Sequence, residues 1–382
     1  MTIDATKLKA ETRSATLDIS DKLVDLSHRI HANPELGFEE TLAAGWLTEE
    51  LARAGLKVQA GVCNLPTAFI ATAGSGPVTL AICAEFDALP GIGHACGHNV
   101  IAAAAVGAGA ALAKVADDLG ITVKVMGTPA EEGGGGKILM MQGGAFDGIH
   151  AAMMVHPGPV EQVQLACLAV SHFAARYTGK AAHASGFPEE GINAADAITI
   201  AQVGIGLLRQ HLDRDSRVHG IVTKGGDAAN IVPALAQAEF FVRAPTLELL
   251  SGIEERVMKC FQAGALATGC SLETIPLGPN YSEFHPDDMM AAAYKANAVS
   301  LGRSFPDTPS TPMSTDMANV SLQIPSIHPM LGIDSLPAVN HQPEFTAAAI
   351  SPPADRAIID GALAMAWTAI DIAISGRFLV GQ

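Results

Sequence analysis

The alternation of apolar and polar positions predicts two kinds of region along the chain. In the first, which extends to about residue 164, helices alternate with short apolar strands. Helices are expected at 5–30, 39–54, 98–116 and 137–142, and strands at 56–60, 68–73, 78–84, 121–126 and 151–155. The strand at 78–84 is almost continuously apolar, which is typical of a strand covered on both faces. Strands alternating with helices predict an α/β fold with a mostly parallel sheet and helices on both faces.

In the second region, which begins near residue 165, the strands are longer and alternate between apolar and polar positions. Strands are expected at 164–178, 218–224, 236–244 and 271–275, with amphipathic helices at 191–211 and 246–267. This β-α-β-β-α-β order describes a ferredoxin-like α+β domain. Helix and loop patterns resume after Pro279 and end in a helix at 346–374. The sequence therefore predicts a discontinuous main domain, 1–164 and 280–382, interrupted by a smaller domain at 165–279.

Composition and charge exclude several classes of protein. The chain has 382 residues, of which 49% are hydrophobic and 16% charged, which excludes disordered and collagen-like sequences and is enough for two cores. The formal net charge is −16, so the average surface repels phosphate backbones and anionic lipids. We therefore expect neither a nucleic acid nor a membrane as a partner.

The cysteines and the apolar runs bear on the cellular compartment. The six cysteines form no CxxC pair and lie mostly in apolar runs, which indicates free thiols and a reducing environment. The first 20 residues are polar and contain no apolar stretch of the kind found in signal peptides. The most apolar helical run, 100–115, is shorter than the ~20 residues that a bilayer requires. These features predict a soluble, cytoplasmic protein.

Metal-ligand types follow three consecutive predicted strands. Cys96 and His98 come after the strand at 78–84, Glu132 comes after 121–126, and His156 directly follows 151–155. In an open α/β sheet the carboxyl ends of the strands form the crevice where ligands bind. A thiolate, two imidazoles and a carboxylate suit zinc, and also manganese or cobalt when more oxygen is present. Each residue alone has an ordinary structural explanation, but their convergence predicts a metal site.

The pair Glu131-Glu132 suggests a division of roles. Neighbouring side chains in an extended segment point in different directions, so one carboxylate can bind metal while the other acts on a water. The alternative is a solvated pair of like charges in a loop. The glycines at 133–136 before Lys137 do not form a phosphate-binding loop, because Glu131 and Ile138 stand where that motif has glycine and serine or threonine.

Seven longer segments carry a resemblance to a known family. They are NPELGFEE, AEFDALPGIGHACGHN, GTPAEEGGGG, VHPGP, KAAHAS, GGDAANIVP and STDMANVSLQIPSIHP. Together they resemble the metal-dependent aminoacylase/carboxypeptidase amidohydrolases, in the branch with hippurate hydrolase, auxin-conjugate hydrolases, aminobenzoyl-glutamate hydrolase and the Xaa-Arg (β-alanyl-lysine) dipeptidase. The resemblance spans nearly the whole chain. It implies a catalytic α/β domain with an inserted ferredoxin-like lid that dimerises.

The resemblance also implies roles for particular residues of the main domain. The metal ligands that it implies are Cys96, His98, Glu132, His156 and His341. They would hold two divalent ions per chain, zinc or manganese, with cobalt and nickel also tolerated, and the Cys96 sulfur would bridge the ions. Glu131 would act as the general base.

In the lid, the resemblance implies that His183, Asn230 and Arg243 bind the substrate carboxylate and the developing oxyanion, with His183 reaching the partner subunit's site. Each lid residue also has a structural alternative. His183 is equally explained as a surface histidine, Asn230 as a turn residue, and Arg243 as the ion-pair partner of a neighbouring strand.

The chain departs from many relatives at three positions. Glu85 stands in place of Asp, Cys83 in place of Arg, and Asn99 in place of Asp. Glu85 and Asn99, together with the segment STDMANVS, resemble the dipeptidase and aminobenzoyl-glutamate subgroup more than the hippurate or auxin-conjugate enzymes. Because of this departure, two roles remain open for Glu85 and Asp87. They could bind the metal directly, or they could lie behind the ligands and hold His98 or a water on the metal.

The expected function is metal-dependent hydrolysis of the amide bond in small dipeptides or N-acyl amino acids. An acidic Asp316 in the substrate pocket would favour a cationic leaving amino acid. One alternative keeps the chemistry and changes the substrate to an N-acyl or aryl-acyl conjugate, as for aminobenzoyl-glutamate or hippurate. Two further alternatives are a non-catalytic metal-binding homologue and a storage or structural dimer stabilised by metal.

Overall fold

The computed structural model describes residues 4–164, 166–307 and 313–378. The chain divides into two compact units, which we call the main unit and the inserted unit. The main unit comprises the chain up to Ala166 and from Phe284 onward, and the inserted unit is Cys167–Glu283. The sequence-based prediction of an insertion at 165–279 starts two residues and ends four residues earlier than the inserted unit.

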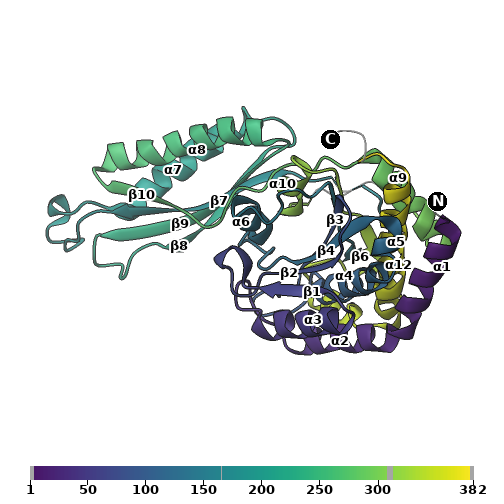
Figure 1. The fold of residues 1–382 in the computed structure, drawn as a ribbon. Helices are drawn as coiled ribbons and strands as arrows, with labels where there is room; N and C mark the ends of the chain where they lie inside the picture. Colours follow the sequence, from purple (N-terminus) through teal and green to yellow (C-terminus); the bar gives the residue numbers. More distant parts are fainter. Residues whose placement is uncertain (1–3, 165, 308–312, 379–382) are drawn as a thin grey trace. The chain divides into compact units, whose positions relative to one another are not determined.

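A six-stranded sheet forms the centre of the main unit (Figure 1). Its strands, in the order in which they pair, are β1 (Lys57–Ala60), β2 (Phe69–Gly74), β4 (Ile121–Gly127), β3 (Val78–Ala84), β5 (Ala151–Met153) and β11 (Ser326–Ile327). The pairs β4–β3, β3–β5 and β5–β11 are parallel, whereas β1–β2 and β2–β4 are antiparallel. The α/β class with a mostly parallel sheet is confirmed. A separate parallel pair joins β6 (His156–Gly158) to β12 (Met330–Gly332).

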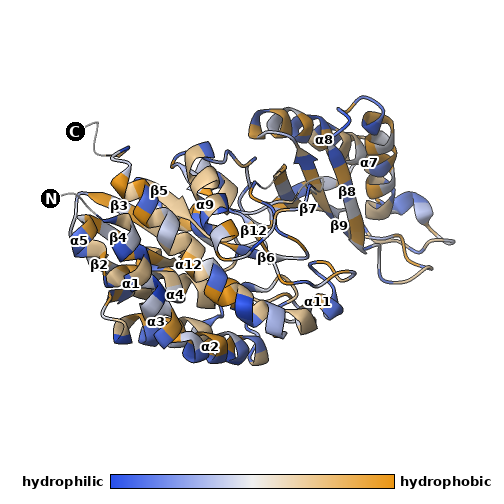
Figure 2. Ribbon diagram, turned by 90° about the vertical axis from the view of Figure 1, so that its right-hand side faces the viewer, coloured by the Kyte–Doolittle hydropathy of each residue, from blue (hydrophilic) through white to orange (hydrophobic). Residues whose placement is uncertain are grey.

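Helices pack around this sheet. Those of the main unit are α1 (Ala5–Asp18), α2 (Ser20–Ala32), α3 (Thr41–Arg53), α4 (His98–Ala113), α5 (Ala116–Leu119), α6 (Gly136–Gln142), α9 (Asp288–Ser300), α10 (Met317–Ser321), α11 (Pro343–Ala348) and α12 (Pro352–Ile374), with a short 3₁₀ turn at Val62–Asn64. The alanine-rich α4 is buried along nearly its whole length between β3, β4 and the helices α2 and α12. Its small side chains allow this close packing, whereas outer helices such as α2 and α3 show mixed polar and apolar positions (Figure 2).

Two predicted long helices are interrupted, and those predictions were wrong in this respect. The helix expected at 5–30 is α1 followed by α2, because Ile19 between them has non-helical φ −115° and ψ 8°. The helix expected at 346–374 is α11 followed by α12, which starts at Pro352-Pro353. Proline is tolerated in the first turn of a helix but not in its interior, so these prolines start a new helix.

By length and composition α12 resembles a membrane-spanning helix, which makes it a stronger candidate than the run at 100–115. In the structure 72% of its most apolar stretch is buried, and it packs on α1, α4 and α9. That is the environment of a core helix.

The inserted unit has its own sheet and core. Its elements follow the order β7 (Ala169–Thr178), α7 (Ala194–Arg209), β8 (Arg217–Lys224), β9 (Leu235–Ala244), α8 (Leu247–Thr268) and β10 (Ser271–Pro276), with a 3₁₀ turn at Pro188–Glu190. The strands pair in the order β10-β7-β9-β8, all antiparallel. α7 and α8 pack on one another and on the sheet (Figure 1). The core between them contains apolar side chains such as Phe173, Phe240 and Phe261. This is the β-α-β-β-α-β arrangement of a ferredoxin-like domain.

Candidate metal centre

The ends of neighbouring strands bring the predicted ligands of the main unit together. The chain leaves β3 at Ala84 and passes through Cys96 before α4 begins at His98. Gly97 separates the two with φ +77°, and a Cβ there would lie 2.4 Å from Pro157 Cγ. Only glycine tolerates both conditions without strain, and it allows Cys96 and His98 to face the same point.

The remaining ligands arrive from other segments. Glu132 follows β4, and His156 is the first residue of β6. His341 comes from the loop before α11, where its backbone N–H donates to Ala95 O at 2.8 Å. This hydrogen bond fixes the loop beside Cys96.

The ligand atoms form three overlapping groups, each with its atoms within 4.8 Å of one another. The groups are Cys96, His98 and His156; Cys96, Glu132 and His341; and Glu85, His98 and Glu131. Cys96 Sγ lies 3.4 Å from His156 Nε2 and 3.5 Å from His341 Nε2. The structure thus brings all five predicted ligands into one cluster, with the thiol of Cys96 shared by two groups.

The donor set fits a divalent cation. His98 Nε2, Glu132 Oε1 and Glu85 Oε2 are buried and have no hydrogen-bond partner among the described residues. Burying unpaired polar atoms costs free energy unless something satisfies them, and here each of the three residues belongs to a group of ligand-type atoms that lie within 4.8 Å of one another. Thiolate, imidazole and carboxylate ligands in one cluster match zinc and manganese chemistry.

Asp87 orients two of these ligands. Its Oδ1 lies 2.9 Å from His98 Nδ1, and its Oδ2 accepts the backbone N–H of Glu132 at 2.9 Å. Burial lowers the pKa of His98, but the carboxylate of Asp87 more than offsets this and raises it well above its usual range. A carboxylate behind a ligating histidine fixes its tautomer and leaves Nε2 free to bind metal. His156 Nδ1 is held in the same way by Pro157 O at 2.9 Å.

Glu131 lies inside the cluster without belonging to the groups that contain Cys96. Its Oε2 is 3.9 Å from His98 Nε2. Burial, followed by the nearby carboxylates of Glu85 and Glu132, raises the pKa of Glu131 well above its usual range. The preceding residue, Ala130, has φ +56°, which an alanine rarely adopts, and Glu40 Oε1 accepts its backbone N–H at 2.8 Å. The backbone is therefore held in a strained turn that presents Glu131 to the cluster.

Lys137 is a residue of this site that sequence reasoning missed. Its Nζ lies 2.5 Å from Glu85 Oε1 and 2.7 Å from Asp316 Oδ1, and all three side chains are fully buried. Asp316 also accepts the Lys137 backbone N–H at 2.8 Å. Asp316 is therefore paired inside the protein, so the expectation that it selects a cationic leaving residue as a free acid in the pocket is wrong.

His328 is a second residue that was missed. Its ring is buried 5.4 Å from the ring of His156, and neither ring nitrogen has a hydrogen-bond partner among the described residues. Burial lowers its pKa to about 3. The strand-end signal that identifies the predicted ligands applies here too, because His328 directly follows the short strand β11. That strand is too short to be recognised from the sequence.

The predicted lid residues lie in two separate places within the inserted unit. Asn230 O accepts the backbone N–H of Ala184 at 3.0 Å, which places His183 and Asn230 side by side in the loops beyond β7 and β8. Arg243 lies at the other end of β9, opposite Val170, with its guanidinium 5.5 Å from the centre of the Phe241 ring. From Leu235 to Arg243 the strand extends roughly 26 Å at 3.3 Å per residue, so Arg243 is far from the other two.

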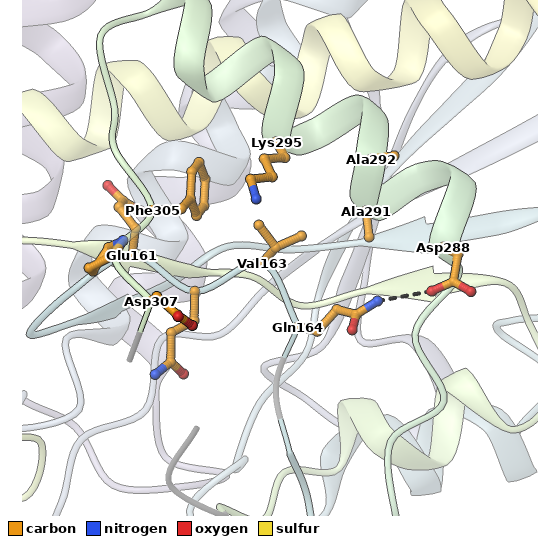
Figure 3. A pocket seen from close by; sticks show the side chains of 11 residues that line it. Glu161, Val163, Gln164, Asp288, Ala291, Ala292, Lys295, Phe305 and Asp307 are labelled. Atoms are coloured by element: carbon orange, nitrogen blue, oxygen red, sulfur yellow. Dashed lines mark hydrogen bonds between the residues drawn. The ribbon is translucent and has the colours of Figure 1, made fainter. Parts of the chain in front are cut away.

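The main unit also has a hollow of about 600 Å³ that is separate from the cluster. Figure 3 shows its lining, which includes Val163, Gln164, Asp288 and Lys295, with Gln164 Nε2 donating to Asp288 Oδ1 at 2.9 Å. Its lining residues include none of the predicted ligands or the base. The chemistry of the described residues is therefore concentrated at the cluster.

Comparison with known proteins agrees with this site. Peptidase family M20/M25/M40 matches residues 81–355. The chain is 37% identical over 393 aligned positions to the Xaa-Arg dipeptidase of Mus musculus, covering 98% of this chain and 91% of that protein. It is 36% identical over 276 positions to one of the p-aminobenzoyl-glutamate hydrolase subunits of Escherichia coli, covering 66% of this chain and 57% of that one. The fold matches the Bacillus subtilis YXEP protein, a dinuclear metal-binding peptidase, with a TM-score of 0.69, 22% identity and coverage of 93% and 98%.

The fold and the site define a metal-dependent hydrolase of amide bonds. The chain belongs to peptidase family M20/M25/M40, which confirms the resemblance found in its motifs.

Proposed function

We propose that this chain hydrolyses small dipeptides and that Glu131 is the general base of the reaction. The convergence of five ligand-type residues in overlapping groups, with Glu131 beside His98, carries this proposal. The dipeptide class is supported by similarity over nearly the whole chain to an Xaa-Arg dipeptidase.

We propose two divalent ions per chain, zinc or manganese, held by Cys96, His98, Glu132, His156 and His341. When bound, such ions polarise a carbonyl and lower the pKa of a water to about 7. Cys96, whose sulfur belongs to two of the three groups, would help to hold both ions.

The proton transfers are assigned to Glu131. It takes the proton of the attacking water as the new C–O bond forms, and it donates that proton to the amine nitrogen as the C–N bond breaks. The products are a carboxylic acid and a free amine, so atoms and protons balance. A positioned base of this kind is typically worth about 10²–10⁴ in rate. Its burial among other carboxylates favours proton uptake, because protonation relieves the like-charge repulsion.

His183 is proposed as the donor to the oxyanion. Its Nδ1 accepts the backbone N–H of Gly186 at 3.1 Å, so in the neutral ring the proton resides on Nε2. That side chain is exposed and presents Nε2–H as a hydrogen-bond donor, the chemistry that an oxyanion requires. Asn230, beside it, is proposed to assist, and Arg243 to bind the substrate carboxylate.

We propose that the protein is a homodimer that pairs through the inserted unit. A small substrate cannot span roughly 26 Å, so His183 and Arg243 of one chain do not serve the same substrate. A second copy resolves this, with His183 acting at the partner's site. The surface for pairing is the open edge of β8 together with the stripe Ile200, Val203 and Leu207 on α7, of which Val203 and Leu207 are 60% and 70% exposed.

We also propose a cytoplasmic location. The six cysteines form no disulfide among the described residues, as expected in a reducing compartment.

A substrate panel tests the dipeptide proposal. Hydrolysis of dipeptides with basic, acidic and apolar leaving residues, and of hippurate and aminobenzoyl-glutamate, is followed by mass spectrometry on protein supplied with Mn²⁺ or Zn²⁺. Preferential cleavage of dipeptides supports the proposal. Faster cleavage of the acyl conjugates assigns the chain to conjugate hydrolysis instead, which the similarity to the p-aminobenzoyl-glutamate hydrolase subunit makes the second candidate.

A further inference from the structure

Lys137 joins two buried carboxylates next to the metal cluster. Its Nζ lies between Glu85 and Asp316, and none of the three side chains is exposed to solvent. A buried ion pair contributes little net stability, since desolvation offsets most of the attraction. A lysine buried between two acids at this position therefore calls for another explanation.

The oxygens of Glu85 are not equivalent. Oε1 is bonded to Lys137 Nζ, whereas Oε2 is buried without a hydrogen-bond partner among the described residues. Oε2 lies 3.5 Å from His98 Nε2, the nitrogen that faces the cluster. The ligand atoms of Glu85, His98 and Glu131 all lie within 4.8 Å of one another. One end of the carboxylate is thus anchored and the other is directed at the metal position.

Asp87 makes a useful contrast, because both of its oxygens are occupied. One contacts His98 Nδ1 and the other accepts the Glu132 backbone N–H. The sequence left open, for both acids, whether they bind the metal or support its ligands. In the structure both oxygens of Asp87 hold other ligands, whereas Oε2 of Glu85 has no hydrogen bond among the described residues and can bind the ion directly.

We propose that Glu85 is an additional metal-facing carboxylate of the site, with Oε2 directed at the ion that His98 binds. Lys137 is its positioning residue, because it holds Oε1, and Asp316 balances the charge of Lys137. The inference rests on the proposed metal site and adds a sixth protein group to it.

The charge balance supports this assignment. Glu85, Lys137 and Asp316 together carry one net negative charge, which is directed toward a cluster that already contains Glu131 and Glu132. A divalent cation offsets that excess. Without Lys137, two further carboxylates would lie buried and unpaired, which like-charge repulsion and desolvation both oppose.

Metal titration tests the proposal without relying on activity. The metal-free protein is titrated with Co²⁺, with ligand-field absorption as the readout, and with Zn²⁺ against a competing chelator. Glu85→Gln is expected to weaken the binding of one of the two ions on the order of 10–100-fold and to change the Co²⁺ absorption spectrum. Lys137→Met is expected to change the metal affinity and the spectrum in the same direction. The double variant should be no weaker than the weaker single variant, because Lys137 acts through Glu85.

Arg303 supplies a matched control. It is a largely buried cation in the same unit, and its hydrogen bonds among the described residues reach Glu161, Asp360 and the backbone of Gly332 rather than the cluster. Arg303→Met should lower thermal stability but leave metal affinity and the Co²⁺ spectrum unchanged. If Lys137→Met does not fold, Lys137→Met with Asp316→Asn retains the net charge of the group and is expected to show the same loss of metal affinity.

The outcomes separate this inference from the proposed function. If the unaltered chain binds no Co²⁺ or Zn²⁺, the metal site itself is wrong. If it binds both ions and Glu85→Gln leaves affinity and spectrum unchanged, Glu85 does not face the metal and only this inference is overturned. If Lys137→Met lowers stability but not metal affinity, as Arg303→Met does, Lys137 has no positioning role.

Discussion

Cys96 Sγ lies 3.4 Å from Nε2 of His156, although the two residues are 60 positions apart in the chain. The same sulfur also belongs to the group formed with Glu132 and His341. One thiol thus connects two sets of ligands, and the cluster depends more on Cys96 than on any residue that belongs to a single set.

Substitution of the shared thiol should therefore differ from substitution of a ligand in one group. Cys96→Ala is expected to lose both ions, whereas His341→Ala is expected to lose one, because the group of Cys96, His98 and His156 remains. Bound metal per chain is measured by elemental mass spectrometry after equilibrium dialysis. Cys260→Ala removes a free cysteine outside the cluster and serves as the control. Equal metal loss in Cys96→Ala and His341→Ala would argue against two sites that share a sulfur.

Removal of the proposed base should separate catalysis from metal binding. Glu131→Gln keeps the size of the side chain but cannot accept the water's proton, so turnover is expected to fall by about 10²–10⁴. Metal content should remain that of the unaltered chain. Steady-state kinetics and metal analysis on the same preparation check both points, with Glu189→Gln in the inserted unit as the control. Retained turnover in Glu131→Gln removes this residue from the base role.

The proposed exchange of His183 between subunits can be tested by mixing. His183→Ala and Glu131→Gln are each expected to be inactive as pure dimers. In mixed dimers one site combines an intact Glu131 with an intact His183 from the other chain, so activity should return after the two are unfolded and refolded together. No recovery in verified mixed dimers would place His183 in its own chain's site or outside catalysis.

The buried histidines predict how stability depends on pH in the metal-free protein. Burial lowers the pKa of His328 to about 3, against about 6.5 in the unfolded chain. Between these values the unfolded state binds more protons, so the free energy of unfolding falls as pH is lowered through this window. His328→Phe should reduce that slope by up to about 1.4 kcal/mol per pH unit, measured by urea unfolding between pH 4 and 7. His211→Phe, at an exposed histidine, serves as the control substitution.

The close packing of α4 on the sheet gives a prediction about stability alone. A Cβ at Gly109 would lie 2.2 Å from Val125 Cγ2 on β4, too close for the core to accept without movement. Gly109→Ala is expected to lower the free energy of unfolding by about 1–3 kcal/mol. Gly45→Ala on α3, where a Cβ meets nothing within 4 Å, is expected to be neutral or stabilising. Thermal and urea unfolding measure the stability of both variants. If Gly109→Ala and Gly45→Ala change the free energy of unfolding equally, the packing argument is wrong.

Much of the site could be predicted because local patterns mark strand ends. Strand β3 coincides with the expected 78–84, and Cys96, His98, Glu132 and His156 all follow strands that hydrophobic periodicity identifies. The partners of Lys137 could not be predicted in this way. Its contact with Asp316 joins residues 179 positions apart, and no local pattern marks which buried lysine meets which acid.

The other features that the sequence did not predict also have local causes. β11 has two residues, fewer than a periodicity can define, so the position of His328 at a strand end was not visible. The break at Ile19 interrupts a continuous amphipathic pattern without a glycine or proline to mark it. By contrast, Pro352-Pro353 does mark the start of α12, and the helix pattern on its amino-terminal side obscured that signal.

The most direct test of the account is hydrolysis of one cleavable dipeptide by metal-free protein that receives Mn²⁺ or Zn²⁺ in steps. We predict no turnover in the metal-free state and turnover that rises as the cluster fills. In Glu131→Gln we predict turnover about 10²–10⁴ lower at every metal concentration. Turnover that survives complete removal of metal, or that returns with metal in the absence of Glu131, would contradict the proposed role of this cluster.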